Sequence, residues 1–143
     1  MLAFGPAAAA LLALAGCGGG SSTPTKTQYV AKVNALCATE QQQLTQIALE
    51  HVKLSVTLDH ANGVREQALM QIEAVKKPSS EAISPEWLQL RRRALELSKK
   101  VAAAGPGSSA ARPLDREYVV VTNKARALGL AYGLTSCRGF AAV

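Results

Sequence analysis

Apolar side chains recur at intervals of three and four residues along almost the whole chain after residue 27. Such intervals place side chains on one face of an α-helix, because a helix has about 3.6 residues per turn. The first series predicts a long helix over residues 27–58, with Glu40 and His51 filling the two gaps in its apolar face. Turn-forming residues at 59–63 are expected to end it. The series comprises Val30, Val33, Cys37, Leu44, Ile47, Leu54 and Leu58.

Three further series predict three further helices. The second helix follows residue 63, and Pro78 ends it because proline lacks the N–H that a helix needs. The third covers residues 85–104, since Ser84, Pro85 and Glu86 are typical of a helix start. The fourth is expected to begin near Asp115. The expected inward residues are Val64, Ala68, Ile72 and Val75, then Trp87, Leu90, Ala94, Leu97, Val101 and Ala104, then Tyr118, Val121, Ala125, Leu128 and Tyr132.

Four amphipathic helices with short connections predict an all-α fold, an up-down-up-down four-helix bundle. Residues 28–143 are enough for one domain with its own core and too few for two. In this topology the start of the first helix and the end of the last lie at the same end of the molecule.

The N-terminal apolar run ends in Leu-Ala-Gly-Cys at residues 14–17. It is shorter than the roughly 20 apolar residues that cross a bilayer, and it ends in small residues, as secretory signals do. Residues 1–16 contain no Lys or Arg. The positive charge usual in such a signal therefore comes from the free amine alone, or the true start lies upstream.

Leu-Ala-Gly-Cys resembles the lipobox of bacterial lipoproteins, in which the cysteine is acylated and becomes the mature N-terminus. The resemblance implies a signal peptide at residues 1–16 and a lipid anchor on Cys17. A flexible Gly/Ser/Thr/Pro tether then extends to residue 27, and the helical domain follows at 28–143. The expected location is the extracytoplasmic face of the cell membrane.

With Cys17 acylated, Cys37 and Cys137 remain as a pair. An exported protein meets an oxidising environment, which favours a disulfide between them. Two buried free thiols are the alternative. A metal site is disfavoured, because neither cysteine has a second Cys or His at ligand spacing.

Small residues form a row on the predicted fourth helix. Ala125, Gly129, Gly133 and Cys137 are spaced by four, which places them on one face. Glycine within a helix costs about 1 kcal/mol relative to alanine, so two of them need a reason. We expect the row to face the first helix and to allow a close approach; the alternative is that the glycines only loosen the helix end.

Two segments at the ends of the domain carry a family resemblance. Residues 29–37 read Tyr-Val-Ala-Lys-Val-Asn-Ala-Leu-Cys, and residues 132–137 read Tyr-Gly-Leu-Thr-Ser-Cys. They resemble the opening and closing motifs of small exported lipoproteins from high-GC actinobacteria. The middle of the chain matches only in its helical pattern. The resemblance implies a disulfide-bonded helical domain and no particular activity.

Residues that could carry catalysis or hold a cofactor are sparse. The two histidines, His51 and His60, have no Gly-x-Ser-x-Gly motif beside them, and the chain contains no Glu-x-x-His pair and no Cys-x-x-Cys-His motif. We therefore expect no enzyme activity, no metal and no cofactor.

The formal net charge is +6, and the third helix is the most basic element, with Arg91, Arg92 and Arg93 followed by two lysines. Glu96 is placed to pair with Arg92 and Lys100 at four-residue spacing, which favours an ordinary solvated face. A patch facing a membrane or a polymer is the alternative, since basic residues are attracted to anionic headgroups. Aromatic residues are not interleaved with these charges, so nucleic-acid binding is not expected.

These observations predict a non-enzymatic lipoprotein whose domain interacts with a partner in the cell envelope. The alternative is a carrier that holds a small apolar ligand between its helices, as bundle cores can.

Overall fold

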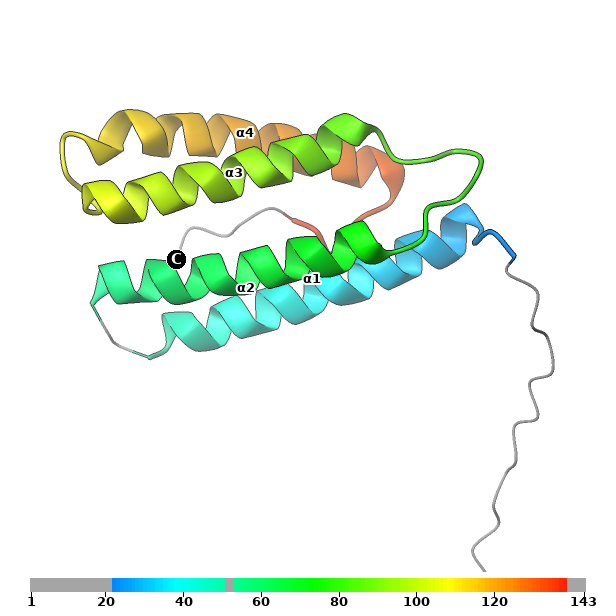
Figure 1. Cartoon of the computed structure of the whole chain (residues 1–143), viewed down its shortest axis with the longest axis horizontal. Helices are drawn as coiled ribbons and strands as arrows, with labels where there is room; N and C mark the ends of the chain where they lie inside the picture. Colours follow the sequence, from blue (N-terminus) through cyan, green and yellow to red (C-terminus); the bar gives the residue numbers. More distant parts are fainter. Residues whose placement is uncertain (1–21, 51–52, 139–143) are drawn as a thin grey trace, which may run out of the picture.

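The computed structural model describes residues 22–50 and 53–138, which form four α-helices and no strand (Figure 1). The helices run alternately up and down, and each packs against the next one along the chain (Figure 1). The predicted all-α four-helix bundle is confirmed. The helices are α1 (Lys26–Ala48), α2 (Leu54–Ala74), α3 (Pro85–Ala104) and α4 (Ala111–Tyr132).

The boundary between α1 and α2 differs from the prediction. The chain turns between Ala48 and Leu54, and α2 continues through the expected turn at residues 59–63. Ala61 and Asn62 are buried there, so packing against the neighbouring helices outweighs their weak turn signal. The helical spacing of apolar residues continues across the observed turn, so the sequence gave no sign of a break between Ala48 and Leu54. His51, expected on the inner face, lies outside the described residues.

The starts of α3 and α4 follow from local chemistry. The Ser84 hydroxyl accepts a hydrogen bond from the Glu86 amide at 3.3 Å, with Pro85 in the first position, as predicted. Helix α4 begins at Ala111, one turn before the expected Asp115, because the Ser108 hydroxyl accepts from the Ala111 amide at 3.1 Å. The first-turn amides of a helix have no helical partner, and this hydroxyl supplies one.

One apolar core receives side chains from every helix and from the segment that follows α4. Its largest member, Trp87, is 1% exposed. The cluster comprises Tyr29, Val33, Cys37, Leu69, Ile72, Ile83, Trp87, Leu88, Leu95, Ala125, Leu134 and Cys137.

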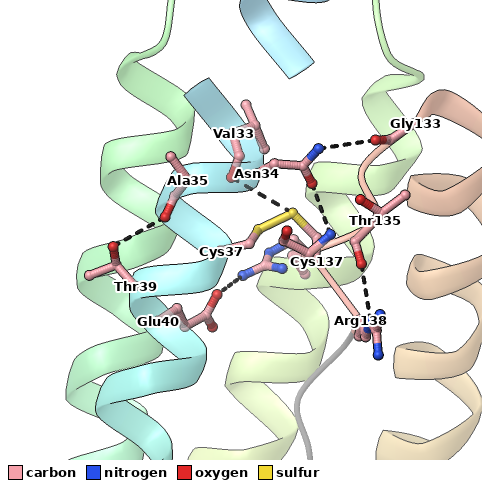
Figure 2. Close-up of a disulfide and its surroundings, with 12 residues drawn as sticks. Val33, Asn34, Ala35, Cys37, Thr39, Glu40, Gly133, Thr135, Cys137 and Arg138 are labelled. Atoms are coloured by element: carbon pink, nitrogen blue, oxygen red, sulfur yellow. Dashed lines mark hydrogen bonds and ion pairs between the residues drawn. A yellow bond between two sulfur atoms is a disulfide. The ribbon is translucent and has the colours of Figure 1, made fainter. Parts of the chain in front are cut away.

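The segment after α4, residues 133–138, connects α4 to α1. In the described part of the chain, no Cα atoms of α1 and α4 approach within 8 Å. Leu134 is buried in the core instead. The Asn34 side chain on α1 donates to the Gly133 carbonyl at 3.1 Å and accepts from the Ser136 amide at 2.9 Å (Figure 2). The segment thus occupies the position where α1 and α4 would otherwise meet.

The predicted disulfide is confirmed: Cys37 on α1 bonds to Cys137, 100 residues later (Figure 2). Cys137 lies beyond the last residue of α4, Tyr132, so the bond closes α1 onto the segment 133–138. Both sulfur-bearing residues are buried in the core. The cross-link therefore holds in place the same segment that Asn34 binds.

The row of small residues is divided between two neighbours, so the expectation that all of it faces the first helix is wrong. A Cβ atom added to Gly129 would lie 2.9 Å from Nε1 of Trp87, on α3. Gly133 ends α4 with a φ of +107°, and a Cβ there would lie 3.7 Å from Val30 on α1. Ala125 packs in the core. The face divides because α4 packs along α3, and only the turn at Gly133 directs the chain to α1.

Candidate functional site

Three charged side chains are buried within the described part of the bundle. Glu40 is 3% exposed, Arg65 is 2% exposed and Arg91 is 4% exposed. Charged residues are almost never buried this fully unless they are paired, so their contacts define the strongest polar feature of the interior.

Glu40 and Arg91 form an ion pair across the core. Nη2 of Arg91, on α3, donates to Oε2 of Glu40, on α1, at 2.7 Å. The Arg91 guanidinium also lies 5.3 Å from the centre of the Trp87 ring, within the range of a cation–π contact. The pair joins two helices that have no Cα atoms within 8 Å of each other among the described residues.

Arg65 on α2 lies in a second polar group. Its Nη1 donates to the Ser98 hydroxyl on α3 at 3.1 Å and to Oδ1 of Asn62 at 3.4 Å. Burial lowers the pKa of Arg65, and the charge of Arg91 lowers it further, while Tyr118 and Glu40 raise it. The interior therefore opposes the charge on Arg65 more than water does.

A cavity of about 330 Å³ opens beside Arg65. It lies between the start of α2, the second half of α3, the α3–α4 turn and the start of α4. These connections lie at the end of the bundle opposite the N-terminus of α1 (Figure 1). The volume is at the small end of the range typical of ligand sites, roughly 300–1,000 Å³. Apolar walls come from Leu54, Leu58, Val101, Pro106 and Val119.

The polar part of the cavity wall consists of Arg65, Ser98, Tyr118 and Asp115. Burial raises the pKa of Tyr118 to about 12, so its phenol keeps its proton at neutral pH and remains a hydrogen-bond donor. Asp115 is only partly buried. The cavity thus combines an apolar wall with a buried cation, a hydroxyl, a neutral phenol and a partly buried carboxylate.

Sequence reasoning placed Arg91 on a solvated face with its neighbours, and this is wrong. Its position provided a signal: it follows Trp87 by four residues and precedes Ala94 by three, so it lies on the apolar stripe of α3. Glu40 gave a similar signal by filling a gap in the first stripe. Nothing in the sequence indicated that Arg65 or Tyr118 would border a cavity.

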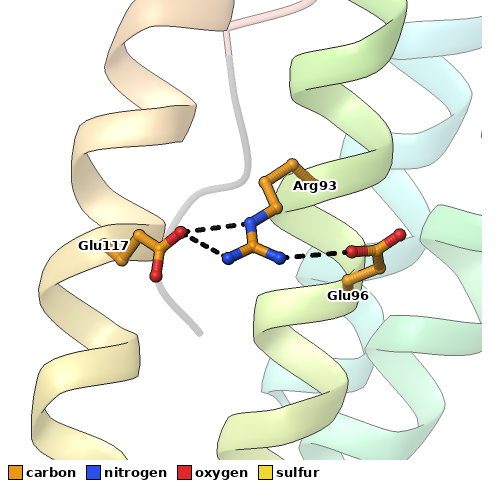
Figure 3. A network of polar contacts seen from close by, with 3 residues as sticks. All are labelled: Arg93, Glu96 and Glu117. Atoms are coloured by element: carbon orange, nitrogen blue, oxygen red, sulfur yellow. Dashed lines mark hydrogen bonds and ion pairs between the residues drawn. The ribbon is translucent and has the colours of Figure 1, made fainter.

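The other two members of the arginine run lie on the surface and pair with acids from neighbouring helices. Arg92 contacts Glu73 on α2 at 2.8 Å. Arg93 contacts Glu117 on α4 at 2.6 Å and Glu96 at 3.5 Å (Figure 3). Glu96 therefore pairs with Arg93, where Arg92 and Lys100 had been expected. Exposed pairs of this kind contribute about 0–1 kcal/mol each.

The remaining predicted positions divide into those the structure places and those it does not. Cys37 and Cys137 are brought together in the disulfide, whereas Cys17 lies outside the described residues. His60 is exposed, with Nδ1 3.5 Å from Glu50. Within residues 22–50 and 53–138, no group of three or more His, Cys, Asp or Glu side chains could hold a metal ion.

Comparison with known proteins yields no match: no protein-family model, no curated protein and no solved structure corresponds to this chain. None of the four described helices is both long and apolar enough to span a bilayer.

Proposed function

We propose that this chain is a non-enzymatic lipoprotein, anchored by an acylated Cys17 at the extracytoplasmic face of the cell membrane, whose bundle serves as an interaction module in the cell envelope. The resemblance to small exported actinobacterial lipoproteins is part of this proposal. The observation that carries it is the buried Cys37–Cys137 disulfide, since such bonds persist in oxidising compartments outside the cytoplasm.

The length of the bundle indicates which of its ends would face away from the membrane in this proposal. The tether enters at Lys26, and α1 has 23 residues, which is about 35 Å of helix. The opposite end, with the cavity and the exposed side chains of Leu49 and Leu54, therefore lies away from the tether. In an anchored protein this end is the one presented to a partner.

A second candidate function is the carrier of a small ligand. The observation in its favour is the cavity beside Arg65, because its apolar walls and few polar groups match the usual composition of ligand sites.

The anchor is tested by Cys17→Ser in the native type of host, with fractionation and intact-mass analysis. The variant should lose the acyl mass and move to the soluble fraction, whereas Ser22→Ala, a control in the same segment, should stay in the membrane fraction. High salt alone should not release the wild type, because acyl chains together with basic residues give firm attachment. Retention of Cys17→Ser in washed membranes would contradict the proposed anchor.

A further inference from the structure

The charge on the surface of the bundle is divided unequally along its length. Helices α1 and α3 begin, and α2 and α4 end, at the end of the molecule where the tether enters (Figure 1). Dividing each helix at its midpoint gives a tether half, residues 22–37, 64–94 and 122–138, and a far half, residues 38–50, 53–63 and 95–121. Leaving aside the three buried charges, the tether half has nine Lys and Arg against four acids, and the far half has five of each. The positive charge of the described surface is therefore concentrated in the tether half.

The acids of the tether half are already paired. Each of the four lies within 4 Å of a basic side chain: Glu66 of Lys99, Glu73 of Arg92, Glu81 of Lys26 and Glu86 of Lys124. By contrast, no carboxylate of the described residues lies within 4 Å of Lys32, Lys77 or Arg126, and all three side chains are exposed. These three cations come from α1, from the α2–α3 connection and from α4. The excess charge of this half is thus accessible to a partner.

Apolar side chains lie beside part of this charge. An open groove of about 680 Å³ between α1 and α2 is lined by Lys32 and Lys76 together with Leu36, Ala74 and Val75. A bilayer interface presents anionic head groups above acyl chains, so it attracts basic and apolar groups together. The groove combines the two kinds of group that such an interface contacts.

We propose that the tether half lies against the anionic lipid head groups of the membrane that anchors the chain, with the α1–α2 groove at the interface. The inference deepens the proposed function and rests on it, because an acylated Cys17 would hold this half near the bilayer. Eight residues separate Cys17 from Lys26, and a Gly/Ser-rich linker of that length has an end-to-end distance of roughly 15 Å. Helix α1 is about 35 Å long, so the far half is directed away from the lipid surface.

The first test measures sedimentation with lipid vesicles at low salt, using the full chain with Cys17→Ser so that acylation makes no contribution. Vesicles of phosphatidylglycerol are compared with vesicles of phosphatidylcholine. One triple variant, Lys32→Gln with Lys77→Gln and Arg126→Gln, removes three charges from the tether half. A matched control, Lys53→Gln with Lys100→Gln and Arg112→Gln, removes three from the far half. All three proteins carry the same N-terminal segment, so differences between them arise in the bundle.

Each basic residue near an anionic surface strengthens binding about fivefold, so the tether-half variant should lose about a hundredfold in affinity for phosphatidylglycerol. The far-half variant should lose less than tenfold, and phosphatidylcholine should bind all three proteins equally. Equal losses in the two triple variants would overturn the inference, because net charge alone would then account for binding. Equal affinity of the unsubstituted bundle for the two lipids would also overturn it. Tighter binding to polyphosphate than to phosphatidylglycerol would assign the surface to a soluble polymer instead.

Salt should abolish the preference for phosphatidylglycerol, since exposed charges are screened beyond about 10 Å at 0.1 M. A preference that survives 1 M salt would contradict an electrostatic contact. The screening also means that Cys17→Ser should still be released when membranes are washed with salt.

The single tryptophan of the chain reports the orientation of the anchored protein. Trp87 lies at the start of α3, in the tether half. On vesicles that carry a dansyl head-group lipid, energy transfer from Trp87 of the acylated wild type should be strong. Moving the tryptophan to the far half, by Trp87→Phe with Val119→Trp, should make the transfer weak, and equal transfer would overturn the orientation.

The vesicle assay and the fractionation of Cys17→Ser can fail separately. If only the vesicle assay fails, the anchor stands and the lipid-facing half is wrong. If only the fractionation fails, the proposed anchor is wrong, and the difference between the two triple variants still decides whether the tether half contacts anionic lipid.

Discussion

Two glycines within helices have opposite surroundings, which makes them a matched pair. A Cβ at Gly129 would lie 2.9 Å from Nε1 of the buried Trp87, whereas a Cβ at Gly63 would meet nothing within 4 Å. Gly129→Ala should therefore lower the free energy of unfolding by about 1–3 kcal/mol, because the buried indole of Trp87 would have to shift. Gly63→Ala should raise it by about 0.5–1 kcal/mol, because alanine loses less backbone entropy in a helix.

Urea unfolding of both variants beside the wild type checks this prediction. The two midpoints should move in opposite directions. Equal shifts would show that Trp87 does not require a glycine at residue 129 and that helix propensity alone sets both effects.

At the scale of helices, the Glu40–Arg91 pair links α1 and α3 through the core. Glu40→Met should destabilise the protein by about 3–5 kcal/mol, because the buried guanidinium of Arg91 loses this carboxylate. The double variant Glu40→Met with Arg91→Met should recover most of the loss, since apolar residues can replace a buried ion pair.

Glu73→Met provides the control for this comparison, since it removes the carboxylate that pairs with the exposed Arg92. It should change stability by no more than about 1 kcal/mol. Thermal unfolding of the wild type, Glu40→Met, the double variant and Glu73→Met measures these changes in stability. A double variant as unstable as Glu40→Met alone would mean that the pair is needed for more than charge balance.

At the scale of the whole molecule, the disulfide closes a loop that spans 100 residues of sequence. Reduction should lower the free energy of unfolding by about 2–4 kcal/mol, because the reduced unfolded chain regains the entropy that the cross-link removed. The segment 133–138 is then held to α1 by the Asn34 hydrogen bonds and by burial of Leu134.

Unfolding with and without reductant, after a count of free thiols, measures this effect. The double variant Cys37→Ser with Cys137→Ser should be as unstable as the reduced wild type and should not respond to reductant. An unchanged transition in the fully reduced wild type would show that the cross-link adds nothing to the stability of the bundle.

Local chemistry was sufficient to predict four helices and their order. The bounds of α3 follow from Ser84 and Pro85 at one end and Gly105 at the other, because caps and breakers act over one turn. The predicted position of the turn between α1 and α2 was wrong. The spacing of apolar residues in the two antiparallel helices continues unchanged across their short connection, so it gave no sign of the turn. The cysteine pairing was predicted because the chain was expected to be exported, and an oxidising compartment favours a disulfide.

Tertiary structure alone decided which surfaces meet. Nothing near Gly129 in sequence shows that its neighbour is Trp87, and nothing near Arg65 shows that it borders a cavity. The contact of Gly129 with Trp87 and that of Arg65 with Ser98 each join residues more than 30 positions apart. The amino-acid sequence by itself determined the helices and their amphipathic faces, since these depend on residues within a turn of one another. It also supplied the two cysteines, although the bond between them joins residues 100 positions apart. Packing decided that segment 133–138 separates α1 from α4, that Arg91 is buried, and where the space beside Arg65 opens, since these depend on how all four helices share one core.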